Sequence, residues 1–303
     1  MPENDNDLDI LGVLKKNPTT TEGKEWSSIA WRNGRRRKII GKGKDNDDKQ
    51  FFVKQLSNDE IGIPEGFIEI RGNGMAEIKS ASGRFFVVDP SMVDDEDNAA
   101  TAQKWGPNVE VTLYLKVARH ADLNNTRNHF ISVSGVSNHF TNVNPIEKRA
   151  NGRAYGVSSH FLRSNVEFKK EVIHGVYSTQ DLDDDWDFPK NKWVGIKFVQ
   201  QKCHGGQHMS LKHYRDLTNC EDGGDWKQIG STHIDDGHWN TFDDDEVQLL
   251  DSVIADGRAL DHPLTDRHQI WNLEAFAGMY IRIDKVKEGF LKKLSVREIN
   301  PLS

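Results

Sequence analysis

Hydrophobic and polar residues alternate strictly along several segments of this 303-residue chain. In 108–119 (NVEVTLYLKVAR), valine and leucine occupy every second position from Val109 to Val117, and mostly polar residues fill the positions between them. Successive side chains of a strand point to opposite faces, so this pattern predicts a strand with one buried and one solvated face. Similar patterns recur in six further segments, 129–140, 166–174, 193–202, 208–216, 279–285 and 291–299.

Turn signals and the near absence of helix signals complete the prediction of the fold. Short strands are predicted at 67–71, 75–79 and 84–88, separated by Gly-Asn-Gly and Ser-Gly hairpin signals. Only 241–254 (TFDDDEVQLLDSVI) has the acidic start and apolar spacing of a helix. The sequence therefore predicts an all-β fold, a jelly-roll β-sandwich of two antiparallel sheets, one of them curved around a concave groove.

Composition narrows the classes of partner and the domain organisation. The net charge is −7, whereas nucleic-acid binding needs clustered Lys and Arg. The basic stretch 32–38 (RNGRRRK) predicts a solvated turn, with an anionic contact patch as the alternative. No apolar run reaches the roughly 20 residues that a membrane-spanning helix needs. We expect a polar tail at 1–15, one domain at 16–300, and a soluble protein, either intracellular or secreted after removal of a signal, with no nucleic-acid or membrane partner.

Cysteine and aspartate patterns favour neither a disulfide nor a metal cofactor. Cys203 and Cys220 are predicted to be free thiols, because a strand separates them and a disulfide needs Cα atoms within roughly 7 Å. The histidines between them lack the spacing of a zinc site. Asp-rich stretches at 91–104, 182–187 and 243–245 lack the calcium-loop pattern and predict solvated loops. A structural Ca²⁺ is the alternative.

Polar side chains on the predicted solvated faces are the candidates for chemistry. The densest group lies in 153–177, where Lys169 and Glu171 are two residues apart on one strand face. A carboxylate beside a lysine stays ionised more readily, which suits orientation of a ligand or action as a base. An ordinary exposed charge pair is the alternative. His174 and His139 are further candidates, each with a purely structural role as the alternative.

Aromatic residues favour a carbohydrate ligand. The chain has eight tryptophans, and most of them lie at predicted strand edges or in polar loops, as Trp193 does. A flat apolar ring beside hydrogen-bonding groups suits the C–H faces and hydroxyls of sugars. Partial burial in the core is the alternative for each tryptophan. The expected partner is a polysaccharide or oligosaccharide, and the sequence does not set the oligomeric state.

Four segments carry a resemblance to a known superfamily: 108–117 (NVEVTLYLKV), 193–199 (WVGIKFV), 209–216 (MSLKHYRD) with Trp226, and 280–298. In these segments the chain resembles the concanavalin A-like jelly-roll superfamily, which includes legume-type lectins, β-glucanases and alginate or glucuronan lyases. The resemblance implies a β-sandwich that handles carbohydrate. The β-glucanase pattern E-x-D-x-x-E is missing, and Gln207-His208 lacks the intervening residue of the lyase Q-x-H strand. No catalytic set therefore transfers.

Two functions remain open on these grounds, and a structural protein such as a viral or surface coat component is the third alternative. The first is a polysaccharide lyase or glycoside hydrolase with its polymer in the groove, and the second is a non-catalytic carbohydrate-binding or surface-interaction module. For a lyase, proton transfer is assigned to Tyr214 with His174 or His139. For a hydrolase, Glu171 and Asp216 form the carboxylate pair. The substrate-binding residues expected in either case are Arg119, Lys197, Arg282, Lys169 and Trp193.

Overall fold

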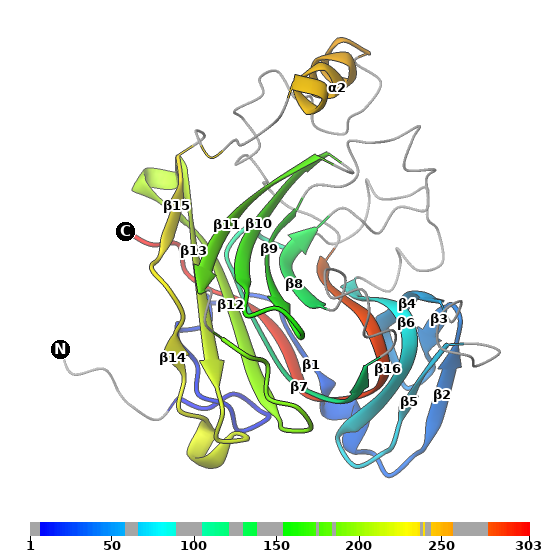
Figure 1. Cartoon of the computed structure of the whole chain (residues 1–303). Helices are drawn as coiled ribbons and strands as arrows, with labels where there is room; N and C mark the ends of the chain where they lie inside the picture. The colour runs from blue at the N-terminus through cyan, green and yellow to red at the C-terminus, as the bar shows by residue number, and fades with distance from the viewer. Residues whose placement is uncertain are drawn as a thin grey trace.

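The strands of this protein form two layers that lie face to face (Figure 1). The computed structural model describes residues 7–57, 66–88, 105–120, 130–137, 154–173, 176–183, 186–236, 239, 244–256 and 278–303. Every strand pairing in these residues is antiparallel. The prediction of an all-β fold built from antiparallel strands is confirmed.

Layer A has the strand order β11-β10-β9-β8-β16-β6-β4-β3. Its own strands are β3 (Gly43–Asp45), β4 (Asp48–Ser57), β8 (Phe130–Ser137), β9 (Ala154–His160), β10 (Val166–Ile173) and β11 (Val176–Asp183). Strands β8 to β11 curve strongly (Figure 1).

Layer B has the strand order β2-β5-β6-β16-β7-β12-β13, with β14 and β15 both paired to β13 and β1 paired to β16. Its own strands are β1 (Glu25–Ser27), β2 (Arg37–Ile40), β5 (Phe67–Ile70), β7 (Val109–His120), β12 (Val194–Cys203), β13 (His208–Asp216), β14 (Lys227–Gln228) and β15 (His233–Asp235). Helical elements are η1 (Ser28–Arg32), η4 (His204–Gly206), η5 (Glu221–Gly223) and α2 (Asp244–Asp256).

Two long strands belong to both layers, so the layers form one continuous curled sheet. β16 (Gly278–Glu298) pairs with β8 through its first residues and with β7 from Val286 onward. β6 (Met75–Val88) pairs with β5 first and with β4 later. The sequence prediction of two separate strands in each of these regions is wrong. The apolar alternation is interrupted by bulges, such as the one between Val286 and Gly289, and not by turns.

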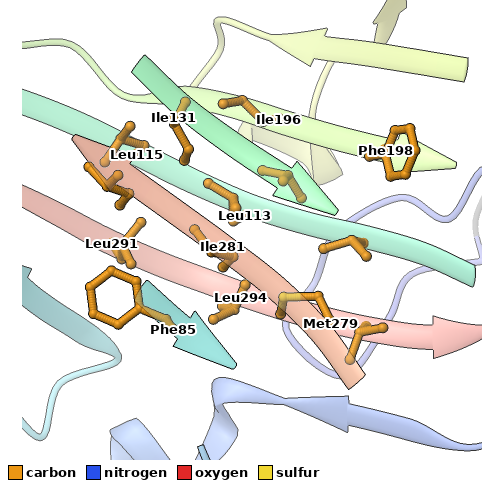
Figure 2. Close-up of a cluster of buried hydrophobic side chains, with 14 of the residues drawn as sticks. Phe85, Leu113, Leu115, Ile131, Ile196, Phe198, Met279, Ile281, Leu291 and Leu294 are labelled. Atoms are coloured by element: carbon orange, nitrogen blue, oxygen red, sulfur yellow. The ribbon is translucent and has the colours of Figure 1, made fainter. Parts of the chain in front are cut away.

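The hydrophobic core lies between the two layers (Figure 2). The alternating residues from Val109 to Val117 are buried in this core, as their period of two predicts. Ile131 of β8 and Ile281 of β16 face them from layer A, and Ile196 lies next to them on β12 (Figure 2). The first requirement of the predicted sandwich, apolar faces turned toward each other, is met.

One buried polar cluster interrupts this core. The ammonium of Lys170 lies 2.8 Å from a carboxylate oxygen of Asp235, and both side chains are fully buried. The hydroxyl of Tyr155 donates a hydrogen bond to the same oxygen. Burial lowers the pKa of Lys170, and burial together with the charge of Asp235 raises the pKa of Tyr155. The three groups tie β9 and β10 of layer A to β15 of layer B.

The N-terminal segment 7–15 packs on the outer face of layer B. Leu11 and Val13 are buried against Tyr114 and Trp226. The Asp9 carboxylate accepts hydrogen bonds from the backbone of Leu11 and Val13 at 2.8 and 2.9 Å, which closes a turn. The segment thus buries Tyr114, although alternation assigns Tyr114 to the solvated face.

Local predictions are mostly confirmed. The helix expected at 241–254 is present as α2, and 241–243 lie outside the described residues. Gly72 and Gly74, with φ of +76° and +87°, form the turn between β5 and β6. Cys203 and Cys220 are free thiols. No helix in the described part of the chain is long and apolar enough to span a membrane.

Candidate functional site

The outer face of the curved part of layer A combines small residues in the middle with charged residues on both sides. Tyr155 and Val157 of β9 face the core, so the alternate residues Ala154, Gly156 and Ser158 face outward. The same alternation in β8 turns Ser132 and Ser134 outward. We call this outer surface, from β11 to β6, the polar face of layer A.

The strand register places the charged residues opposite one another. Glu167 of β10 pairs with Ser158, Ser158 pairs with Ser132, and Ser132 pairs with Arg282 of β16. Three strand spacings, roughly 14 Å, therefore separate the backbones of Glu167 and Arg282. In the next row Lys169 pairs with Gly156. In these two rows long side chains face each other across small ones, and Phe130 and His160 lie on the same face at the ends of β8 and β9.

An ion-pair group forms one side of the polar face. Asp284 lies 2.6 Å from the guanidinium of Arg282 and 2.8 Å from that of Arg84 on β6. Burial opposes the charge of Arg282, but Asp284 and more distantly Glu171 raise its pKa. Burial raises the pKa of the neighbouring Tyr280 to about 12. The charge of Glu171 therefore acts on β16 from the other side of the face.

The opposite side carries a lysine over an exposed aromatic ring. The ammonium of Lys169 lies 3.9 Å from the ring centroid of Tyr177 on β11, and Tyr177 is 42% exposed. Burial lowers the pKa of Lys169, while the charge of Glu171 raises it. The side therefore offers a cation, a carboxylate and a flat ring within one strand pair, β10 and β11.

A buried histidine with open hydrogen-bonding capacity lies at the end of β9. His160 is 6% exposed, and neither of its ring nitrogens has a hydrogen-bond partner in the described residues. Its Nε2 atom lies 3.5 Å from a carboxylate oxygen of Glu167, and its ring centroid lies 5.5 Å from that of Phe130. The arrangement can accept or donate a hydrogen bond at the edge of the polar face.

The structure brings three of the sequence-predicted site residues onto this one face: Lys169, Glu171 and Arg282. His139 and His174 lie outside the described residues. Arg119 lies at the end of β7, where its guanidinium is 2.6 Å from a carboxylate oxygen of Glu288.

The other predicted residues, Tyr214, Asp216, Lys197 and Trp193, lie on the outer face of layer B, so the core separates them from the polar face of layer A. The predicted carboxylate pair of Glu171 and Asp216 therefore does not exist as a pair. Asp216 is fully buried and accepts hydrogen bonds from Tyr114, at 2.8 Å, and from the loop that follows β13. Its carboxylate organises this loop and is closed to a substrate, which corrects its catalytic assignment.

Lys197 is also buried, in an ion-pair network beneath the N-terminal segment. Its ammonium lies 2.7 Å from Glu110 and 2.9 Å from the Thr112 hydroxyl. The guanidinium of Arg297 lies 2.9 Å from the other oxygen of Glu110. Burial raises the pKa of Glu110, but these two cations outweigh it and hold the pKa at about 2. The assignment of Lys197 to substrate binding is corrected, because its charge is already neutralised and covered.

Several members of the polar face were not chosen from the sequence. Alternation in 130–137 (FISVSGVS) places Ser132 and Ser134 on the face opposite the apolar residues, so the sequence alone could have identified these two serines. Alternation in 279–285 also turned Asp284 outward, but its contact with Arg84 had no signal in the sequence, because it depends on the pairing of β6 with β16. His160 was one of twelve histidines and carried no distinguishing pattern.

The described residues hold no group of three or more His, Cys, Asp or Glu side chains arranged to bind a metal ion. The Asp-rich stretch 91–104 and Asp243 lie outside those residues. The alternative of a structural Ca²⁺ therefore stays a prediction.

Comparisons with known proteins return lectins among the solved structures. No family model and no curated protein matches the chain. Winged bean acidic lectin, complexed with methyl-alpha-D-galactose, has a TM-score of 0.39 and 6% identity, covering 92% of this chain and 99% of the lectin. Peanut lectin, with a 9mer peptide, has a TM-score of 0.36 and 8% identity, and the match covers 88% of this chain and 98% of the lectin. The Bauhinia forficata lectin in complex with GalNAc has a TM-score of 0.36 and 8% identity, and the match covers 92% of this chain and 99% of the lectin. Similarity of this size identifies no ligand.

Proposed function

We propose that this chain is a non-catalytic carbohydrate-binding module and that its glycan lies on the polar face of layer A. The observation that carries the proposal is the register of β8 and β9, which places Ser132, Ser134, Gly156 and Ser158 between two charged sides, with Phe130 and His160 at the ends of the two strands. The small side chains are buried, and the half-exposed Glu167, Lys169, Glu171 and Arg282 on the two sides form the accessible part of the face.

The chemistry of the face suits sugar hydroxyls. Lys169 and Arg282 supply donors, and Glu167 and Glu171 supply acceptors, so one ligand hydroxyl can donate and accept at once. Tyr177 adds a half-exposed ring; Lys169 lies over one of its faces, and the C–H face of a sugar would pack on the other. Hydrogen bonds to charged groups are stronger than those between neutral groups, which favours orientation of a polar ligand.

Binding is preferred to hydrolysis because the predicted carboxylate pair is divided between two surfaces. A glycoside hydrolase needs two carboxyl groups roughly 5–10 Å apart across one bond. Glu171 and Asp216 belong to opposite outer faces of a sandwich whose layers are themselves about 10 Å apart. Tyr214 shares the outer face of layer B with Asp216 and is half-buried there.

The test combines binding and turnover on one set of variants. Glu171→Gln with Tyr177→Ala should weaken glycan binding at least ten-fold on an array and in calorimetry, since it removes an acceptor and a ring. Tyr214→Phe is the matched control, because it alters an aromatic hydroxyl on the other layer, and its affinity should equal that of the parent protein. Absorbance at 235 nm with uronate polymers and reducing-sugar release from neutral glucans should both stay at background.

Two results would reject the proposal. Turnover of any of these polymers by the parent protein would establish an enzyme. Unchanged glycan affinity in the Glu171→Gln, Tyr177→Ala variant, with its fold intact by circular dichroism, would move the glycan away from the polar face.

A further inference from the structure

A second group of side chains lies on the outer face of layer B, on strands that extend from β2 to the start of β12. Its members are half-buried or exposed cations interleaved with aromatic rings. We call it the basic row and define it as Arg36, Lys38, Phe67, Arg71, Lys79, Lys116, Trp193, Phe290 and Lys292.

The register aligns this group across five strands. Lys38 of β2 pairs with Glu69, which pairs with Glu77 of β6, and Glu77 pairs with Phe290 of β16. Phe290 pairs in turn with Lys116 of β7. Four strand spacings, roughly 19 Å, separate Lys38 from Lys116. The cations therefore form an extended line and not a compact cluster.

Aromatic rings hold the cations at one end of the line. The ammonium of Lys116 lies 4.7 Å from the ring centroid of Phe290 and 5.5 Å from that of Trp193. The ammonium of Lys292 lies 4.6 Å from Trp193 and 5.4 Å from Tyr114. A cation over a ring is attracted by the ring's negative face, so these ammonium groups keep fixed positions.

The same arrangement recurs toward β2. Lys38 lies 3.7 Å and Lys79 lies 5.5 Å from the ring centroid of Phe67. The guanidinium of Arg71 lies 5.3 Å from the ring centroid of Phe290. Every aromatic ring in the basic row thus has at least two cations over it or beside it.

Positive charge exceeds negative charge along the line. The two carboxylates between the strands are already paired, Glu69 with Arg36 at 2.8 Å and Glu77 with Arg71 and Lys79. No carboxylate in the described residues lies within ion-pair distance of the other three lysines, Lys38, Lys116 and Lys292.

These surplus cations also repel one another. Burial lowers the pKa of Lys292, and the charges of Lys293 and Lys116 lower it further, while Cys220 and Asp216 oppose this. An anionic group placed between Lys116 and Lys292 would relieve the repulsion. The basic row therefore attracts anions although the whole chain has a net charge of −7.

We propose that the basic row binds an anionic polysaccharide, a chain that carries carboxylates or sulfates, at a site separate from the polar face of layer A. Cations held at intervals along roughly 19 Å match a polymer with charges at intervals. Single-stranded nucleic acid is disfavoured because its bases need free aromatic faces, and cations occupy these. A duplex is disfavoured because the flat row offers no helix or two-stranded ribbon to enter a groove.

The binding test uses charge-matched variants. Lys116→Gln with Lys292→Gln should lower affinity for polygalacturonate and for heparin by up to about 25-fold, at up to about five-fold for each lysine. Lys202→Gln with Lys227→Gln removes the same charge elsewhere and should leave affinity within about two-fold. An equal loss of affinity in both double variants would mean that only the overall charge attracts the polysaccharide, and it would overturn the proposal. Equally tight binding of polyglutamate or single-stranded DNA by the parent protein would overturn the choice of polysaccharide.

A measurement on the unaltered protein covers the case in which the variant does not fold. Lysines are methylated with and without heparin and quantified by mass spectrometry. Heparin should protect Lys116, Lys292 and Lys38 and leave Lys227 reactive, and equal reactivity at all four would overturn the proposal. Failure here is distinct from failure of the proposed function, because Glu171→Gln with Tyr177→Ala leaves the basic row intact and should bind heparin normally.

Discussion

Replacement of Lys197 by methionine tests whether this lysine serves stability or a ligand. Met keeps the length of the side chain and removes the charge that lies 2.7 Å from Glu110. Arg297 stays 2.9 Å from the other carboxylate oxygen, so Glu110 loses one of its two cations in a fully buried position. We expect a stable but weakened fold.

The magnitude follows from the pKa of Glu110, which is about 2 in the folded protein against 4.5 for an ordinary glutamate. At about 1.36 kcal/mol for each pH unit, this difference corresponds to about 3 kcal/mol of stability at neutral pH. Burial of the Lys197 ammonium offsets part of that gain. Removal of one partner from a buried pair costs about 3–5 kcal/mol. The two figures agree on a loss of about 3 kcal/mol for Lys197→Met.

The sign of the pH dependence is also fixed. Because folding depresses the pKa of Glu110, the stabilisation is present above about pH 4.5 and is lost as the pH falls toward 2. Urea unfolding of the parent protein and of Lys197→Met should differ by about 3 kcal/mol at pH 7 and converge below pH 4.5. Lys212→Met, on the same strand pair, serves as the control. A variant with unchanged unfolding free energy and abolished glycan binding would refute the structural role of Lys197.

Three further predictions concern stability. Burial lowers the pKa of His213 to about 3, so the fold should lose about 2 kcal/mol between pH 6.5 and 4.5. His213→Leu should remove this slope in urea unfolding, and an unchanged slope would contradict the prediction. Gly195→Ala should lower the melting temperature, because a Cβ there would lie 2.8 Å from the Trp226 ring; an unaltered melting temperature would show that the ring moves freely. Asp235→Asn should cost about 3–5 kcal/mol by leaving Lys170 buried without its counter-charge, and calorimetric unfolding within 1 kcal/mol of the parent would argue against the pair.

Alternation was sufficient to assign the buried faces of β7, β10, β12 and β13. Val109 to Val117 face the core, and β13 begins and ends at the residues predicted from sequence, His208 and Asp216. This worked because the period of two is a local property of the chain. Bulged strands were harder, since the breaks near Val286 in β16 resemble the ends of two shorter strands.

The candidate site was predictable only in part, because a two-layer sandwich has two outer faces. Lys169 and Lys197 both alternate away from the core, but they do so from different layers. Which outer face a residue joins depends on strand order, which alternation does not encode. The sequence also did not show which outer-face residues another segment would bury. Alternation places Tyr114 on the solvated face, but Leu11 and Val13 bury it.

The shared membership of β16 in both layers has a consequence for biosynthesis. Until Gly278–Glu298 has been translated and has left the ribosome, neither β7 nor β8 can pair with it, and both keep a bare backbone edge. Exposed edges recruit other strands, so nascent or truncated chains that stop before residue 278 should aggregate or require a chaperone. Completion of this fold is therefore expected only after residue 298 has left the ribosome.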